Sequence, residues 1–271
     1  MNILITGANG HIGKTLYSNL KDKYNTIGLT REMFDLTNTD ATCKWFVGKQ
    51  FDIVLHAAIV GGGRLQKDNN NTIIKNITMF NNLLANKQHF SRLISFGSGE
   101  EIFNPNGSYA ISKNIIAEYI RDTENFYNLR IFGLFDENGL STRFIKANIL
   151  RYINKQPMLI HTNKIMDFIY MKDLVSLVDH FVVSDNIPKV VNCCYEEKYT
   201  LNTITNMINN LGNYKVPVII ENKKELQFYC EESNLPFINF VGLKNGLVET
   251  YNKLLLTYPH NNDIIANREN K

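Results

Sequence analysis

The sequence predicts an α/β fold, in which a doubly wound parallel sheet is followed by a smaller C-terminal α/β lobe. Three observations predict it. Short apolar runs alternate with amphipathic stretches as far as Phe135, the runs are almost continuously apolar, and a glycine-rich turn follows the first run. Continuous apolar strands are typical of sheets covered on both faces, and right-handed crossovers make such sheets parallel.

The periodicity of the apolar residues predicts the elements in order. Up to Phe135, strands are expected at 2–6, 25–29, 52–58, 92–96 and 128–132, and helices at 11–24, 41–49, 71–87 and 108–126. Beyond Phe135 the alternation weakens. There we expect a helix at 142–155, a strand pair at 158–162 and 167–171, a helix at 172–183 and a strand at 190–195.

Composition narrows the class of protein. With 271 residues, 44% of them hydrophobic and 20% charged, the chain can bury a full core. The net charge of +3 is small and its basic residues are scattered, so neither a nucleic acid nor a membrane is expected as a partner. No apolar stretch is long enough to span a bilayer. The four cysteines have neither metal-like nor redox spacing, so no metal site is expected. They are expected to be buried, reduced thiols, which predicts a cytoplasmic protein. These cysteines are Cys43, Cys193, Cys194 and Cys230.

The glycine-rich turn lies between a predicted strand and a predicted helix. Gly7, Gly10 and Gly13 are three residues apart. In such a turn the first glycine allows a tight bend, the second lets backbone approach a pyrophosphate, and the third lets the helix pack closely. The helix N-terminus then faces the anion. The turn therefore predicts a dinucleotide site, to which we also assign Asn9, His11 and Ile12.

The end of the second strand predicts which dinucleotide binds. NAD-selective folds often place an acid there, whereas this chain has Thr30 and Arg31. A guanidinium can pair with the 2′-phosphate of NADP(H). NADP(H) is therefore the predicted cofactor. The alternative is that Arg31 is only a solvent-exposed residue of a loop.

A candidate catalytic group follows the strand at 92–96. Tyr109 and Lys113 are four residues apart in a predicted helix with Ser108 as its N-cap, so both side chains project from one face. An ammonium so placed lowers the pKa of the phenol, which can then protonate a carbonyl oxygen as hydride arrives. Ser98 is the hydroxyl expected to hold that oxygen, because the strand should end at Phe96; Ser95 is the competing choice.

The glycine spacing and the SYAISK motif together resemble the extended short-chain dehydrogenase/reductase superfamily (NAD-dependent epimerase/dehydratase family), which acts on nucleotide sugars. The resemblance covers most of the chain and implies a Rossmann fold. The segments DIVLHAAIVGGG, KNITMFNNLLA, FGSGEEIF, LRIFGLF and STRFIKANILRY are similar to those of GDP-L-fucose synthases. These enzymes epimerise a GDP-4-keto-6-deoxy sugar and then reduce its 4-keto group with NADPH. The resemblance further implies cofactor contacts at Asp35, Leu36, Ala57, Ala58 and Asn76.

The chain departs from that family at the epimerising groups. Glu100 stands where the family has its acid/base cysteine, and Arg143 stands where it has its histidine. Since the pKa of arginine stays above about 12, Arg143 cannot exchange protons near neutral pH. The reduction machinery is complete, whereas epimerisation by the family's route is in question.

Several functions remain open at this point. The chain is expected to reduce the 4-keto group of a 4-keto-6-deoxy nucleotide sugar, with or without epimerisation by Glu100. One alternative is a 4,6-dehydratase or epimerase with bound NAD and Glu100 as the base, since Ser98-Gly99-Glu100 imitates the dehydratase pattern. An alternative of another class is an inactive NADP(H)-binding regulatory protein, which would need neither Tyr109 nor Lys113.

The C-terminal part is expected to bind the sugar nucleotide. Arg143 and Lys164 are candidates for its diphosphate. Tyr229 either contacts the base or packs half-buried. The predicted division is residues 1–135 with 165–195 as the NADP-binding Rossmann domain, 136–164 with 196–259 as the substrate-binding lobe, and 260–271 as a flexible tail. The resemblance also implies a homodimer formed through helices such as the one with Tyr109.

Overall fold

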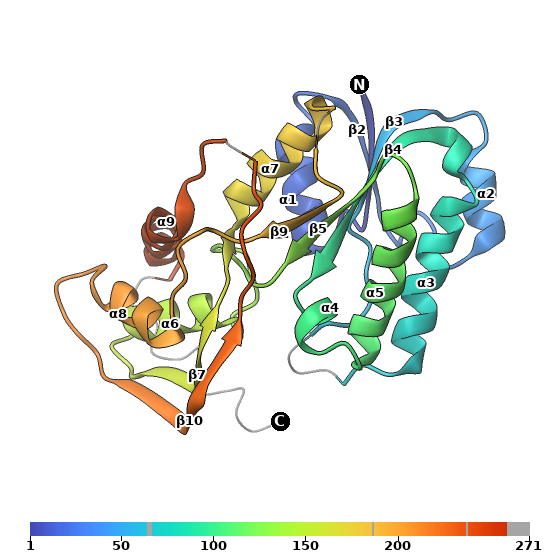
Figure 1. Cartoon of the computed structure of the whole chain (residues 1–271). Coiled ribbons are helices and arrows are strands. Elements are labelled where there is room, and N and C mark those ends of the chain that lie inside the picture. The colour runs from blue at the N-terminus through green and yellow to red at the C-terminus, as the bar shows by residue number, and fades with distance from the viewer. Residues whose placement is uncertain (64–66, 186, 237, 259–271) are drawn as a thin grey trace. The chain divides into compact units, whose positions relative to one another are not determined.

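The structure is a computed structural model, and it describes residues 1–63, 67–185, 187–236 and 238–258 (Figure 1). The described residues form two compact units. Unit 1 contains Met1–Phe132, Leu174–Cys193 and Ser233–Ile238, and unit 2 contains Gly133–Asp173, Cys194–Glu232 and the described residues from Asn239 onward. Each unit is described by itself below.

Unit 1 is built on a parallel sheet whose described strands lie in the order β2-β1-β3-β4-β5-β9. The strands are β1 (Asn2–Thr6), β2 (Asn25–Leu29), β3 (Phe51–His56), β4 (Phe90–Ser98), β5 (Phe126–Ile131) and β9 (Val190–Cys193). The central residues of β1, β3, β4 and β5 are buried, as the continuous apolar runs of the sequence predict, whereas those of β2 are half-buried. The sheet confirms the doubly wound α/β class.

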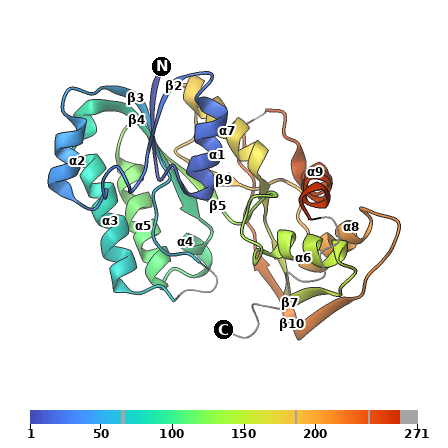
Figure 2. The same ribbon diagram turned by 180° about the vertical axis from the view of Figure 1, so that it is seen from behind.

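Helices cover both faces of this sheet. Figures 1 and 2 show α1 and α7 on one face and α2, α3 and α5 on the other. On the second face, Phe80 and Leu83 of α3 and Ile116 of α5 pack with Leu4 and Leu93 of the strands. The helices are α1 (His11–Leu20), α2 (Thr39–Phe46), α3 (Asn70–Leu84), α4 (Glu100–Phe103), α5 (Ser108–Asp122) and α7 (Met171–Val183), with a 3₁₀ turn, η1 (Lys87–His89).

The order of the strands determines where a ligand can bind. The chain runs from β1 outward to β2, and then returns to place β3 on the other side of β1. In doubly wound sheets, ligands bind at the carboxyl ends of the strands where the order reverses. In this chain, that position is the end of β1, from which the Gly7–Gly13 turn leaves.

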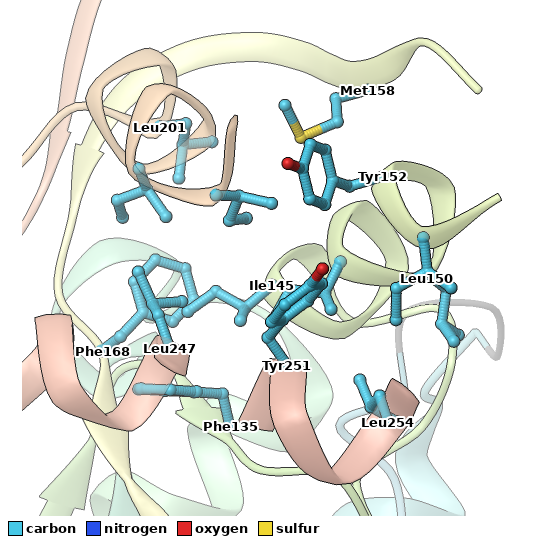
Figure 3. Close-up of a cluster of buried hydrophobic side chains, with 14 of the residues drawn as sticks. Phe135, Ile145, Leu150, Tyr152, Met158, Phe168, Leu201, Leu247, Tyr251 and Leu254 are labelled. Carbon is cyan, nitrogen blue, oxygen red and sulfur yellow. The ribbon is translucent and has the colours of Figure 1, made fainter. Parts of the chain in front are cut away.

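In its described residues, unit 2 combines two parallel strand pairs with the helices α6, α8 and α9. Strand β6 pairs with β8, and β7 pairs with β10. These elements are β6 (Leu134–Phe135), α6 (Phe144–Ile153), β7 (Met158–Met166), β8 (Ile169–Tyr170), α8 (Leu201–Asn209), β10 (Val218–Tyr229) and α9 (Gly242–Thr257). Figure 3 shows their common core, where Tyr152 of α6 and Tyr251 of α9 lie among aliphatic side chains.

Unit 2 differs from the sequence prediction in its strand pairing. Residues 158–162 and 167–171 were expected to pair with each other, but β7 pairs with β10 and β8 pairs with β6. The pairing of β6 with β8 also puts residues 165–173 in unit 2, although the sequence assigned 165–195 to the nucleotide-binding domain. The predicted tail at 260–271 lies outside the described residues.

Two further expectations concern the surface. No described helix is long and apolar enough to cross a membrane. The thiols of Cys193 and Cys194 are buried, but Cys43 is exposed, which corrects the expectation of four buried thiols. Cys43 is exposed because only Thr42 and Phe46 of its helix α2 are buried.

Candidate active site

The glycine turn after β1 is a backbone cradle that side chains would fill. Gly7 has φ +68°, and a Cβ on it would lie 2.7 Å from Cα of Ala58 at the end of β3. A Cβ on Gly13 would lie 2.3 Å from the carbonyl oxygen of Gly7. Gly10 is the N-cap of α1, which has no side-chain cap in the described structure. The turn therefore fits a pyrophosphate, which binds to main-chain N–H groups at a helix N-terminus.

Within the turn, the side chain of Asn9 reaches the segment that follows β2. Asn9 is exposed and donates a hydrogen bond from Nδ2 to Oε2 of Glu32 at 2.9 Å. Residues His11 and Ile12 form the half-buried first turn of α1. The N–H of Ala8 donates to the carbonyl of Leu29, which ties the turn to β2. The dinucleotide residues predicted at this turn thus lie on one short stretch of backbone.

The end of β2 has two charged residues of opposite sign. Arg31 and Glu32 are both exposed. A hydrogen bond with Thr30 is the largest of several causes that lower the pKa of Glu32 below its usual value. The sequence prediction considered only Arg31 and missed Glu32, although an acid next to Arg31 was the available signal. A guanidinium favours a 2′-phosphate, whereas a carboxylate favours a 2′-hydroxyl.

Asp35 and Leu36, at which the resemblance implies cofactor contacts, have structural partners. Oδ1 of Asp35 accepts hydrogen bonds from the backbone N–H and hydroxyl of Thr37, and the backbone bond is the largest cause that lowers the Asp35 pKa. Leu36 is buried, and its carbonyl accepts a hydrogen bond from Nδ2 of Asn82 at 2.8 Å. These contacts secure the segment between β2 and α2.

The loop after β3 is held by Asn76 of α3. The Oδ1 atom of Asn76 accepts from the Val60 N–H at 2.8 Å, and its Nδ2 atom donates to the Val60 carbonyl and to Oγ of Ser112. Asn76 is 1% exposed, so its side chain acts on the loop and on α5. Ala57 and Ala58, at the start of this loop, are half-buried beside Gly7.

The candidate catalytic residues come from the end of β4 and the first turns of α5. Ser98 is the last residue of β4, so the strand runs two residues beyond its predicted end at Phe96. Ser95 is buried inside the strand, 1% exposed, whereas Ser98 is half-buried at its carboxyl end. The N-cap of α5 is Gly107, not Ser108 as the sequence suggested.

Lys113 links α5 to β4. Its Nζ donates a hydrogen bond to the carbonyl of Phe96 at 2.5 Å and lies 5.7 Å from the centroid of the Tyr109 ring. Burial lowers the pKa of Lys113 to about 8, while the negative charge of Glu101 acts in the opposite direction. The ammonium form therefore predominates at neutral pH, and it lies beside the phenol.

The Tyr109 ring packs on the loop after β3. A Cβ on Gly62, which has φ +70°, would lie 2.8 Å from Cε2 and Cζ of Tyr109. The Gly62 N–H donates to the carboxylate of Asp68. Glycine at position 62 thus gives the phenol ring its space.

The two acids after Ser98 have different surroundings. Glu100 is half-buried, and its N–H donates to Oγ of Ser98 at 3.2 Å. Glu101 is buried and forms an ion pair with Arg130 of β5. Glu101 is therefore not an acid of a solvated turn, since Arg130 compensates its buried charge.

Two of the predicted substrate residues meet in unit 2. Lys164 of β7 places its Nζ 4.6 Å from the centroid of the Tyr229 ring, because β7 and β10 are paired. This is a cation–π contact. Arg143 is the exposed N-cap of α6.

Two buried acids of unit 2 hold its backbone. Asp167 pairs with Lys198 at 2.8 Å and accepts the Glu231 N–H. Asp173 accepts the N–H groups of Val241 and Gly242 at the start of α9. These contacts indicate that the two acids stabilise the fold of unit 2.

The glycine cradle, the parallel sheet and the Tyr109–Lys113 pair define a nucleotide-dependent enzyme fold, and comparison with known families agrees. The chain belongs to the NAD dependent epimerase/dehydratase family, whose model matches residues 3–194. The family's cofactor is a nicotinamide dinucleotide.

Individual relatives are more distant. The chain is 24% identical over 303 aligned positions to GDP-L-colitose synthase of Yersinia pseudotuberculosis, covering 92% of this chain and 96% of that protein. Its fold is similar to that of a GDP-mannoheptose C4 reductase from Campylobacter jejuni with NADP bound, with a TM-score of 0.77, 17% identity and coverage of 93% and 98% of the two chains. It is also similar to a GDP-L-fucose synthetase from Naegleria fowleri bound to NADP, with a TM-score of 0.75, 17% identity and coverage of 95% and 93%.

Proposed function

We propose that this chain is an NADPH-dependent reductase that converts the 4-keto group of a 4-keto-6-deoxy nucleotide sugar, with GDP as the nucleotide, to an alcohol. The observation that carries the proposal is the buried Lys113 ammonium beside the Tyr109 ring, hydrogen-bonded to the strand that ends in Ser98. The named relatives, which act on GDP-sugars, support the choice of substrate.

NADPH, when bound at the glycine turn, supplies the hydride. The Tyr109 hydroxyl then gives its proton to the C4 oxygen, so that a ketone plus hydride plus proton becomes an alcohol. The Lys113 ammonium stabilises the phenolate that this transfer leaves behind. The Ser98 hydroxyl donates a hydrogen bond to the same oxygen and holds it against Tyr109.

Arg31 supports NADPH as the cofactor, since it is exposed at the end of β2 and can pair with a 2′-phosphate. Arg143 and Lys164 are proposed to bind the diphosphate of the substrate. Tyr229 is proposed to contact the base, and its position beneath Lys164 supports this role.

A second candidate function is an epimerase or dehydratase that keeps NAD bound and uses Glu100 as its base. Two observations favour it. Glu100 follows Ser98 closely enough for its N–H to bond the Ser98 hydroxyl, and Glu32 stands at the end of β2, where an acid favours NAD.

We also propose that the enzyme is a cytoplasmic homodimer. The large apolar side chains exposed on α3 and α5 support a partner on these helices; they are Ile74, Ile115 and Tyr119. The mass of the protein in solution, measured by light scattering during gel filtration, tests this proposal. A monomer at micromolar concentration contradicts it.

The test of function is the oxidation of NADPH by purified protein when GDP-4-keto-6-deoxy-mannose is added, with the product identified by NMR. The matched control is Tyr109→Phe, which keeps the ring against Gly62 and removes only the hydroxyl. Oxidation to a C4 alcohol in the wild type, reduced about 100-fold or more in the variant, is the expected result. Equal turnover in both proteins contradicts the role of Tyr109. An inverted product at C3 or C5 makes Glu100 an epimerising base, and tight NAD binding without NADPH oxidation favours the second candidate.

A further inference from the structure

We propose that Glu101 is a positioning residue of the active site, where its carboxylate holds the backbone of Ser98 and supports the charge of Lys113. This inference rests on the proposed function, because that function makes Ser98 and Lys113 catalytic. It concerns a residue one position beyond Glu100, which replaces the acid/base cysteine of the family that the sequence resembles.

The carboxylate of Glu101 is buried within hydrogen-bonding distance of three residues from two strands of unit 1. Its side chain is 1% exposed. Oε1 accepts the Ser98 N–H at 2.7 Å, and Oε2 accepts Nδ2 of Asn128 at 3.2 Å and Nε of Arg130 at 3.0 Å. Glu101 thereby connects the last residue of β4 to two residues of β5.

The backbone around Ser98 leaves space for this carboxylate. Gly97 precedes Ser98 in β4, and a Cβ on it would lie 2.4 Å from Oε1 of Glu101. A glycine at position 97 is therefore required for the carboxylate to reach the Ser98 N–H. The bond determines the direction of the main chain at the residue whose hydroxyl is proposed to hold the substrate.

The charge of Glu101 is compensated by Arg130 of β5. Arg130 is 19% exposed and also donates from Nη1 to Oδ1 of Asn192 at 3.0 Å, which orients the guanidinium. A buried carboxylate is costly unless it is paired and hydrogen-bonded, and Glu101 meets both conditions.

The negative charge of Glu101 acts on the pKa of Lys113. Burial lowers the pKa of Lys113, and Glu101 is the charged group that raises it again. Among the described residues, the titratable groups that interact with Lys113 include Glu101 of α4, Tyr109 of α5 and His56 of β3. His56 adds no positive charge, because burial, with the Lys113 charge as a smaller cause, lowers its pKa to about 3. Without Glu101, the Lys113 ammonium would lose its proton at a lower pH.

An ion pair with a purely structural role would have the same contacts. The test must therefore measure the titration midpoint of Lys113. The variant Glu101→Gln keeps an oxygen that can accept the Ser98 N–H but removes the charge. The variant Glu101→Asp keeps the charge, but its side chain is shorter by one methylene, so the carboxylate lies farther from the Ser98 N–H. The control is Glu118→Gln on α5, where the carboxylate is 61% exposed and pairs with Arg121.

The measurement is the pH titration of lysine side chains by ¹³C NMR in protein labelled with ¹³C-lysine, with the Lys113 signal assigned through Lys113→Arg. In Glu101→Gln the Lys113 midpoint is expected to fall by about 0.5 to 1 pH unit, and in Glu118→Gln it is expected to stay unchanged. In Glu101→Asp the midpoint is expected to move little, while the amide proton of Ser98 shifts upfield because its hydrogen bond is lost. An unmoved Lys113 midpoint in Glu101→Gln, or an unmoved Ser98 amide in Glu101→Asp, overturns the proposal.

If Glu101→Gln does not fold, the double variant Glu101→Gln with Arg130→Met removes both partners and leaves no unpaired buried charge. The same fall of the Lys113 midpoint is expected there, and its absence overturns the proposal. The NMR readout needs no substrate. Its result is therefore separate from the proposed function, which fails on its own if the wild type shows the Lys113 response but oxidises no NADPH with keto-sugars. If that function holds, the alkaline limb of kcat/KM moves with the Lys113 midpoint.

Discussion

Replacing Lys113 with methionine is expected to make the protein more stable at pH 7 and catalytically inactive. Lys113 is 6% exposed, and burial lowers its pKa from the usual 10.5 to about 8. Since each pH unit of pKa difference corresponds to about 1.4 kcal/mol, the buried ammonium lowers the free energy of unfolding by about 3 kcal/mol. Loss of the hydrogen bond to the Phe96 carbonyl costs about 1 to 2 kcal/mol. A net gain of about 1 to 2 kcal/mol remains.

The sign of the effect depends on pH. The pKa of Lys113 is lower in the folded than in the unfolded state, so the cost of the ammonium is fully present below about pH 8 and disappears above 10.5. The advantage of Lys113→Met should therefore shrink as the pH rises through this window, and then reverse. Urea denaturation of the cofactor-free proteins at about pH 7 and about pH 10, followed by circular dichroism, measures the difference.

The control is Lys172→Met, since the Lys172 side chain is 54% exposed. Its difference from the wild type should not vary in the same way over this range. A Lys113→Met difference that is the same at both pH values would refute the reasoning, because the buried ammonium would then impose no cost on folding.

Four other substitutions test the site. Gly13→Ala puts a Cβ 2.3 Å from the Gly7 carbonyl oxygen, so the affinity for NADPH should fall about 10-fold or more. A fluorescence titration measures this affinity, and an unchanged value would contradict the role of the glycine turn as a pyrophosphate site. Arg31→Ala should lower the preference for NADPH over NADH about 10-fold, and Glu32→Ala should raise it, as judged from the two kcat/KM values; shifts of the same sign would argue against opposing roles. Asn76→Leu leaves the Val60 N–H without its acceptor and should lower the free energy of unfolding by about 2 to 4 kcal/mol in a urea titration, whereas an unchanged midpoint would exclude the proposed hold on the loop.

Much of unit 1 was predictable because its signals are local. Each strand of the sheet is an apolar run of a few residues, and each covering helix has its own amphipathic period. The turn at Gly7 and Gly13 was visible because its spacing reflects short-range geometry. Tyr109 and Lys113 were visible because four residues are one helical turn.

Unit 2 was less predictable because its strands pair across long gaps in the chain. The sequence of β7 does not reveal that its partner is β10, some sixty residues later, and the short β6 and β8 have too few residues to show a period. Residues 165–173 fall in unit 2, because strand pairing decides to which unit a segment belongs.

Two acids, Glu32 and Glu101, show the same limit within the site. Glu32 is next to Arg31 in the sequence, but its bond to Asn9 depends on β1 and β2 lying side by side. Glu101 resembles any acid in a turn until β5 brings Arg130 and Asn128 against it.

The sequence by itself therefore determined the α/β class, the glycine turn and the Tyr109–Lys113 spacing, all of which depend on residues within a turn or a strand of one another. Only the tertiary structure decided that Glu101 is buried against Arg130, that Lys113 reaches the Phe96 carbonyl, and that Lys164 lies over Tyr229. The physical reason is that burial and charge pairing are properties of neighbours in space. A residue's pKa and the cost of its charge are set by the strands and helices that fold around it.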